Sequence, residues 1–209
     1  MAKLQIDMKR HNNSQIFQRP VMAGAKYGAI AGLIATWSIS TAIAASELEL
    51  HLPISTFYAI IGIGLGLTDF VTAAYLGFGL HLATGTILGA VIGGIAVRVE
   101  SKKNITDFFR PHKSILMGMG TGILVWLVLF LPVTALIIQP SIGRIEDVLS
   151  LGRNSTPFTV FDIFNLGSSF SGIAISAIVF HLVWGAIFGY IISSLLRIRI
   201  YRYDNRPQK

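Results

Sequence analysis

The chain has 209 residues, of which 53% are hydrophobic and only 13% are charged, and its mean hydropathy is +0.65. Soluble domains carry about 25% charged residues, so this composition excludes an ordinary soluble globular domain and indicates a protein embedded in lipid. The absence of cysteine excludes disulfides, zinc–thiolate sites, iron–sulfur ligation and thiol catalysis.

Four long apolar stretches follow one another along the chain, and none contains an Asp, Glu, Lys or Arg. Each is long enough for the roughly 20 residues that cross a bilayer core of about 30 Å as a helix. The sequence therefore predicts an all-α polytopic membrane protein with four transmembrane helices. The stretches are Tyr27–Ala45, Val71–Val97, Ser114–Ile138 and Ser171–Leu196.

A fifth apolar stretch, Ile54–Leu67, has only 14 residues and is too short to span. Its length favours a short re-entrant or interfacial helix on the outer side. Thr68 is the expected N-cap of the following span, and Asp69 the acid expected in its first turn. The outer Asp162 is likewise expected to cap a helix or to lie at the interface.

The basic residues indicate the orientation. Five Lys or Arg residues precede the first span, five lie in the loop 98–113, five lie from Arg197 to the C-terminal end, and only Arg144 and Arg153 remain. The positive-inside rule then predicts a multi-pass protein of the plasma (inner) membrane with both termini cytoplasmic. The distribution of basic residues thus explains the net charge of +7 by membrane topology and by contact with anionic headgroups. Nucleic acid is therefore not favoured as a partner.

The second and fourth spans resemble each other. From His81 and from His181, six of twelve positions are identical at an offset of 100. The first and third spans match more weakly, through Gly28, Gly32 and Trp37 against Gly118, Gly122 and Trp126. The segment before each histidine span also recurs, as Pro53, Ser55 and Phe57 against Pro157, Thr159 and Phe161.

This duplication predicts two parallel two-helix repeats, related by a pseudo-twofold axis along the membrane normal. The predicted organisation is a basic tail (1–26), a first repeat (27–97) with the short outer helix 54–67, a cytoplasmic basic loop (98–113), a second repeat (114–197) with the outer loop 139–170, and a basic tail (198–209).

Glycines recur at spacings of four residues on all four spans, so each set lies along one helix face. Small residues at this spacing let two helices approach closely, which predicts a compact four-helix bundle packed through glycine. The expected packing residues are Gly28, Gly32, Gly85, Gly89, Gly118, Gly122, Gly185 and Gly189.

His81 and His181 each stand near the middle of a span, where an ionisable side chain is costly. Three interpretations stay open. Each imidazole bonds a hydroxyl or carbonyl of a neighbouring helix, or the pair lines a polar site for a small ligand or protons, or the two are axial ligands of haem. The hydroxyls expected within reach are those of Thr36, Ser38, Ser40, Thr41, Thr84, Thr86 and Ser176.

From His181-Leu182-Val183-Trp184, preceded by an outward helix and a long outer loop, and from the Gly28-x-x-x-Gly32 entry of the first span, the chain resembles the YagU-like inner-membrane proteins. These are small bacterial and archaeal membrane proteins of about this length. The resemblance implies residence in a membrane and assigns a role to no residue.

The acidic residues form no catalytic set with the histidines, and no nucleotide, protease or nucleophile motif is present, so neither an enzyme nor a metal site is expected. The sequence favours a structural or binding module, as an accessory subunit of a membrane complex or a homo-oligomer. The alternatives are a small transporter or channel lined by His81 and His181, or a haem protein using the same two residues. Apart from that haem, no cofactor is expected.

Overall fold

A computed structural model describes residues 2–49, 52–103, 111–141, 144, 148 and 170–204, with side chains in the ranges 21–49, 52–99, 112–141 and 177–197 and at 144 and 148. Within these residues the chain is helical and contains no strand. Asp162 and the short outer helix expected in the second half lie outside the described residues.

Four helices are long and apolar enough to cross a membrane, as the sequence predicted. They are α1 (Ala2–Glu49), α3 (Phe70–Lys103), the helix that begins as α4 (Pro111–Val125) and continues to Ser141, and α8 (Phe170–Asp204). Their apolar segments are Val21–Glu49, Phe70–Val99, His112–Ser141 and Ala177–Arg197. The first segment begins before the expected Tyr27, because the helix continues without a break through the basic tail.

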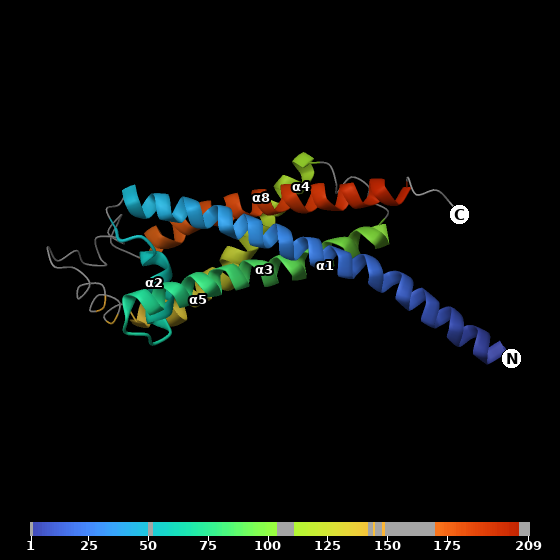
Figure 1. Ribbon diagram of the computed structural model, residues 1–209, viewed down its shortest axis with the longest axis horizontal. Helices are drawn as coiled ribbons and strands as arrows, with labels where there is room; N and C mark the ends of the chain where they lie inside the picture. Colours follow the sequence, from blue (N-terminus) through green and yellow to red (C-terminus); the bar gives the residue numbers. More distant parts are fainter. Residues whose placement is uncertain are drawn as a thin grey trace.

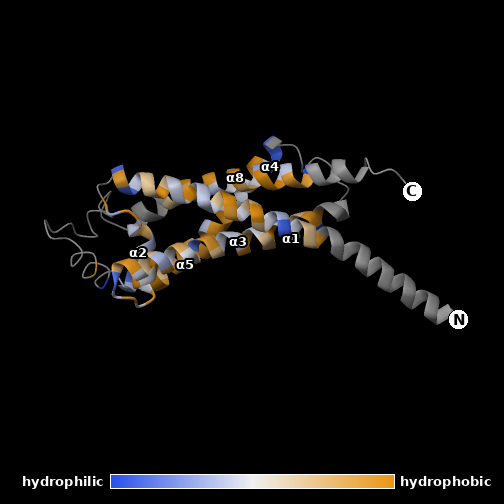
Figure 2. Ribbon diagram, in the orientation of Figure 1, coloured by the Kyte–Doolittle hydropathy of each residue, from blue (hydrophilic) through white to orange (hydrophobic). Residues whose placement is uncertain are grey.

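The long helices lie along one another, and both chain ends are at the same end of the bundle (Figure 1). α3 and α8 run in the same direction. Apolar residues cover the helices over most of their length, while hydrophilic residues gather toward the ends (Figure 2). Many large apolar side chains are exposed, as expected for helices that face lipid.

The third long helix changes its winding on either side of Pro132. After α4 come η2 (Trp126–Phe130, π), α5 (Leu131–Val133), η3 (Thr134–Ile138, π) and η4 (Gln139–Ser141, 3-10). Proline has no N–H to donate, and its ring clashes with the carbonyl four residues earlier. The wider turns, in which the Leu131 N–H reaches the Trp126 carbonyl, let the helix continue past it.

α1 and α3 pack antiparallel through glycine. A side chain on Gly28 would collide with the Gly89 carbonyl, and one on Gly32 with the Gly85 carbonyl. Gly24 meets Gly93 in the same way one turn further along. The two backbones are therefore in direct contact over three turns, which is the arrangement that small residues at every fourth position permit.

α4 and α8 pack antiparallel by the same device. Gly118 lies against the Gly185 carbonyl and Gly122 against the His181 carbonyl, while Gly189 lies against the carbonyl of Ser114. The contact of Gly118 with Gly185 thus matches that of Gly32 with Gly85. The contact of Ser114 with Gly189 matches that of Gly28 with Gly89. The sequence alone matched Gly28 with Gly118. The structure shifts this match by one helical turn, because Ser114 occupies the position at which a glycine was expected.

The two pairs are joined through α1 and α8. Ala31, Ala35 and Ile39 of α1 are buried against Trp184 and Phe188 of α8, together with Ile192 and Leu196. We call this contact the α1–α8 seam. α3 and α4 make no comparable contact, so the packing between the two pairs is not symmetric.

A short helix, α2 (Thr56–Gly64), occupies the position that the sequence predicted for it. It packs antiparallel to the first turns of α3, where Gly62 contacts the backbone of Ala73 and Gly77 contacts that of Tyr58. α2 lies along α3, and its Ala59, Ile60 and Ile63 are buried in this contact.

Replacing Gly85 or Gly185 with leucine is expected to destabilise the protein by about 1–3 kcal/mol or more, because no space exists for the side chain. Gly79 of α3 and Gly120 of α4 are the matched controls, since nothing lies within 4 Å of a Cβ built at either position. Thermal unfolding in detergent measures the difference. Equal melting temperatures for Gly85→Leu and Gly79→Leu would show that the α1–α3 contact is not close.

Candidate functional site

His81 and His181 occupy the same place on their helices. α3 begins at Phe70 and α8 at Phe170, so each histidine is eleven residues into its helix. Both side chains are half-buried, and they are close enough for their charges to interact. The packing between the helix pairs therefore brings the two predicted residues into one region.

The His181 imidazole bonds its own helix. Its Nδ1 lies 2.8 Å from the Ala177 carbonyl oxygen. A carbonyl only accepts, so Nδ1 carries the proton and Nε2 keeps its lone pair. The ring also packs edge-on against Phe130, with centroids 5.2 Å apart. The hydrogen bond to a neighbouring helix that the first sequence interpretation required is not made by this residue.

The His81 imidazole lies against Tyr58 of α2. Their ring centroids are 5.4 Å apart, and Tyr58 also packs edge-to-face with Phe78, with ring centroids 5.2 Å apart. The Nε2 atom of His81 and the hydroxyl of Tyr58 are both buried, and within the described residues neither makes a close hydrogen bond, although the Ser40 side chain of α1 lies near the Tyr58 hydroxyl. Tyr58 itself is only 4% exposed. We call Tyr58, His81 and His181 the histidine site.

Most of the hydroxyls expected to bond the histidines are used within their own helices. This pattern is usual for serine and threonine in membrane helices, where the carbonyl four residues back is always within reach. Thr84 is exposed, and the side chain of Ser176 lies outside the described residues. The donors and their acceptor carbonyls are Thr36 to Gly32, Ser38 to Ile34, Ser40 to Thr36, Thr41 to Ser38, and Thr86 to Leu82.

Thr36 makes a second bond that the sequence did not suggest. The indole N–H of Trp184 donates to its hydroxyl oxygen at 2.9 Å, inside the α1–α8 seam. Thr36 is 1% exposed and Trp184 6%, and the indole stacks on Phe188 with centroids 5.3 Å apart. This is a buried polar contact between the two helix pairs, and it lies beside the Gly85 turn of α3.

Glu47 is a site residue that the sequence analysis missed. Its carboxylate is fully buried and accepts hydrogen bonds from the backbone N–H groups of Ser55 and Phe57, both at 2.7 Å. The carboxylate supplies acceptors to the start of α2, where the first N–H groups have no intrahelical partner. The available signal was an acid two residues after an apolar span and seven residues before the next apolar stretch.

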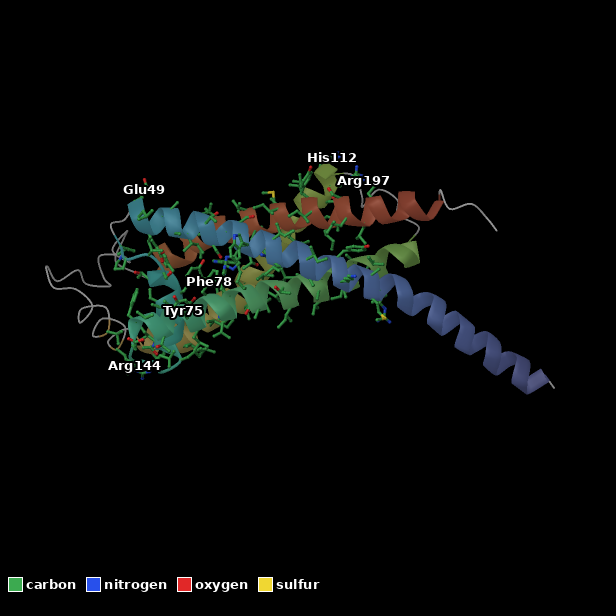
Figure 3. All side chains as sticks on the ribbon, in the orientation of Figure 1. Glu49, Tyr75, Phe78, His112, Arg144 and Arg197 are labelled. Carbon is green, nitrogen blue, oxygen red and sulfur yellow. The ribbon has the colours of Figure 1, made fainter. Side chains whose placement is uncertain are left out.

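The other end of α2 meets the chain after the third long helix. The Ser141 hydroxyl donates to the Gly64 carbonyl at 3.5 Å, and Arg144 lies beside Gly66. Figure 3 shows Arg144 and Glu49 at the end of the bundle opposite to His112 and Arg197. A cation near the carbonyl end of α2 and a carboxylate at its amide end both match the helix dipole.

Asp69, not Thr68, caps α3. Its carboxylate accepts the Thr72 N–H at 2.7 Å, while Thr68 is one residue too early and is exposed. Hydrogen bonds from Thr72 hold the pKa of Asp69 below its usual value. Its position at the start of α3 fits the capping role expected for it.

Two imidazoles are the donors that the region offers to a cofactor. No group of three or more His, Cys, Asp or Glu side chains that could hold a metal ion is present in the described part of the chain. Chemically, the histidine site presents one phenol, one imidazole nitrogen without a partner and one imidazole whose Nδ1 is already bonded. Such groups donate and accept hydrogen bonds within an apolar surrounding.

Comparison with protein-family models, with curated proteins and with solved structures found no match for this chain.

Thr36→Val is expected to cost about 1–3 kcal/mol, because the Trp184 indole N–H would lose its acceptor in a buried seam. Thr36→Ser keeps the hydroxyl and should be closer to the parent protein. Thr41→Val is the matched control, since that exposed hydroxyl bonds its own helix. A double-mutant cycle with Trp184→Phe, read from thermal unfolding, should give a coupling of about 0.5–3 kcal/mol. Strict additivity would contradict the contact.

Proposed function

We propose that the chain is a membrane-embedded binding module, and that the histidine site holds the hydrogen-bonding group of a small lipid-soluble ligand. The observation that carries this proposal is the pair of buried polar atoms without partners, Tyr58 Oη and His81 Nε2, which belong to two rings in contact. A buried polar atom without a partner costs about 1–3 kcal/mol. A ligand that bonds both atoms removes that cost.

The surrounding packing supports binding in place. Glycine contacts fix α3 against α1 and α8 against α4, so the two histidine-bearing helices have little freedom to move relative to their partners. Aromatic rings, Phe78 and Phe130, cover the sides of the site. A rigid site with few polar groups on an apolar background is typical of small-molecule recognition.

Transport is the second candidate, and it uses the same residues. Titratable side chains follow one another from the outer end of the bundle inward, from Glu47 to Tyr58 to His81 to His181. Ionisable groups in series inside a membrane are typical of proton or ion pathways. In that case the site would be occupied transiently by a passing ion, and no ligand would remain bound after purification.

The proposal also includes the orientation of the protein in the membrane and the origin of its two halves by internal duplication. The end that carries Lys26, Arg98, Lys113 and Arg197 is assigned to the cytoplasm, in contact with anionic headgroups of the plasma membrane. The equal starts of α3 and α8 and their matching glycine contacts favour an internal parallel repeat. The resemblance to the YagU-like proteins agrees with this location.

The binding proposal predicts a ligand-dependent gain in stability that the site residues control. Total lipid extract added to the purified protein should raise its melting temperature by several degrees, since occupancy at about 100 times Kd contributes about 2.7 kcal/mol. His81→Leu and Tyr58→Phe should remove the gain, whereas His112→Leu, at an exposed histidine, should keep it.

The same measurement without lipid separates binding from structure. Tyr58→Phe should leave the melting temperature nearly unchanged, because within the described residues the phenol oxygen lies near Ser40 but makes no close hydrogen bond. A large loss of stability in this variant would mean that the hydroxyl is structural. An equal lipid effect in all three variants would remove the ligand from this site.

The proposed orientation is tested by thiol labelling, for which the chain offers a cysteine-free background. Glu49→Cys and Asn205→Cys, in intact cells, should react with an impermeant maleimide from opposite sides of the membrane. Labelling of position 205 from outside, or of both positions from the same side, would reverse or exclude the proposed topology.

A further inference from the structure

The start of α2 depends on one side chain from another helix. The helix has nine residues, and a helix this short is marginal by itself. The Glu47 carboxylate of α1 binds the N–H groups of Ser55 and Phe57, one with each oxygen. Ser55 has φ 75°, a left-handed conformation that a non-glycine residue adopts only at a cost. The same two bonds therefore hold a strained entry turn and the amide end of the helix.

α2 also covers the histidine site. Its Tyr58 lies against His81, and its Ala59 and Ile63 are fully buried in a cluster with Ala73 and Ala74 of α3. Tyr58 thus places α2 against one side of the His81 ring, and α2 lies toward the end of the bundle at which Glu49 and Arg144 are found (Figure 3). Movement of α2 away from α3 would uncover both His81 and Ala74.

The attachment at the far end of α2 is weaker. The Ser141 hydroxyl reaches the Gly64 carbonyl only at 3.5 Å, which is at the limit of a hydrogen bond, and Arg144 is exposed. The charge-assisted bonds at the amide end are short, and such bonds are about twice as strong as neutral ones. Of the polar attachments at the two ends of α2, the one to Glu47 is therefore the stronger.

We propose that α2 is a cover over the histidine site, and that the ionised Glu47 carboxylate is the latch that keeps it closed. A proton taken from the outer aqueous phase converts one carboxylate oxygen into a hydroxyl, which cannot accept both N–H groups as before. The entry turn then releases α2, and the outer side gains access to His81. This regulation rests on the proposed function only because the covered site is the proposed binding site.

The described charged and titratable groups around the latch are few. Tyr58 of α2 interacts electrostatically with Glu47, while Glu49 is exposed on the same end of α1. On α3, His81 lies beyond Tyr58, and Asp69 is at the opposite end of α2 together with Arg144 of the segment after η4. Asp69 at the start of α3 also titrates, so the first turn of α3 can respond to pH. The amides of α3 beyond this turn therefore serve as the internal reference for α2.

Hydrogen exchange of the intact wild-type protein in lipid nanodiscs tests the latch without any ligand. Between about pH 7 and about pH 4, protection of the α2 amides, corrected for intrinsic rates, should fall by about tenfold or more, while α3 around Gly85 should stay protected. Glu47→Gln should show the low protection at both pH values. Glu49→Gln should behave as the wild type. Equal protection of α2 at both pH values in the wild type would overturn the proposal.

Thiol labelling measures the opening directly. It stays decisive if Glu47→Gln folds too poorly in nanodiscs for hydrogen exchange. Ala74→Cys, beneath α2, should react slowly with an impermeant maleimide at neutral pH and about tenfold faster when combined with Glu47→Gln, but not with Glu49→Gln. Leu65→Cys, exposed beside α2, should react fast in every background. Equal rates for Ala74→Cys with and without Glu47→Gln, or an equal increase with Glu49→Gln, would overturn the latch.

Neither readout uses a ligand, so the two proposals fail separately. A fixed α2 leaves lipid-dependent stabilisation at the histidine site intact. If α2 opens but lipid does not stabilise the protein, the proposed binding function is wrong and the proposed cover stands.

Discussion

Polar groups inside a bilayer find no water, so every backbone N–H and carbonyl must be satisfied within the protein. The long helices meet this demand through their own hydrogen bonds, including the wide turns that carry the third helix past Pro132. The short helix α2 cannot do so at its first turn. Glu47 of α1 supplies the missing acceptors, and these bonds hold the start of α2, which packs against α3 along its length.

The same absence of water changes how helices associate. Lipid is as apolar as leucine, so burial of apolar side chains gives little reason for two helices to join. Close backbone contact does, and glycine permits it in both pairs, α1 with α3 and α4 with α8. The contact between the pairs is of another kind: larger side chains fill the α1–α8 seam, and Trp184 bonds Thr36 within it.

The histidine site is where the general rule is not followed. Many serine and threonine hydroxyls bond a carbonyl of their own helix, yet Tyr58 Oη and His81 Nε2 are buried and make no close hydrogen bond within the described residues. A structural role alone would be met equally well by phenylalanine and leucine, which have no polar atoms to satisfy. The cost of these two atoms is the reason to assign the region a binding function. The helix that contributes Tyr58 is also the one that Glu47 holds.

The sequence by itself determined the four long helices, the short helix before Asp69 and the glycine faces, because apolar length and four-residue spacing are local properties of the chain. It also selected His81 and His181 by their cost in lipid. Only the tertiary structure decided the partners: Thr36 bonds Trp184, Gly118 takes the place matching Gly32, and Glu47 reaches α2. These contacts join segments whose separation in the chain carries no periodic signal, so they exist only once the helices are packed.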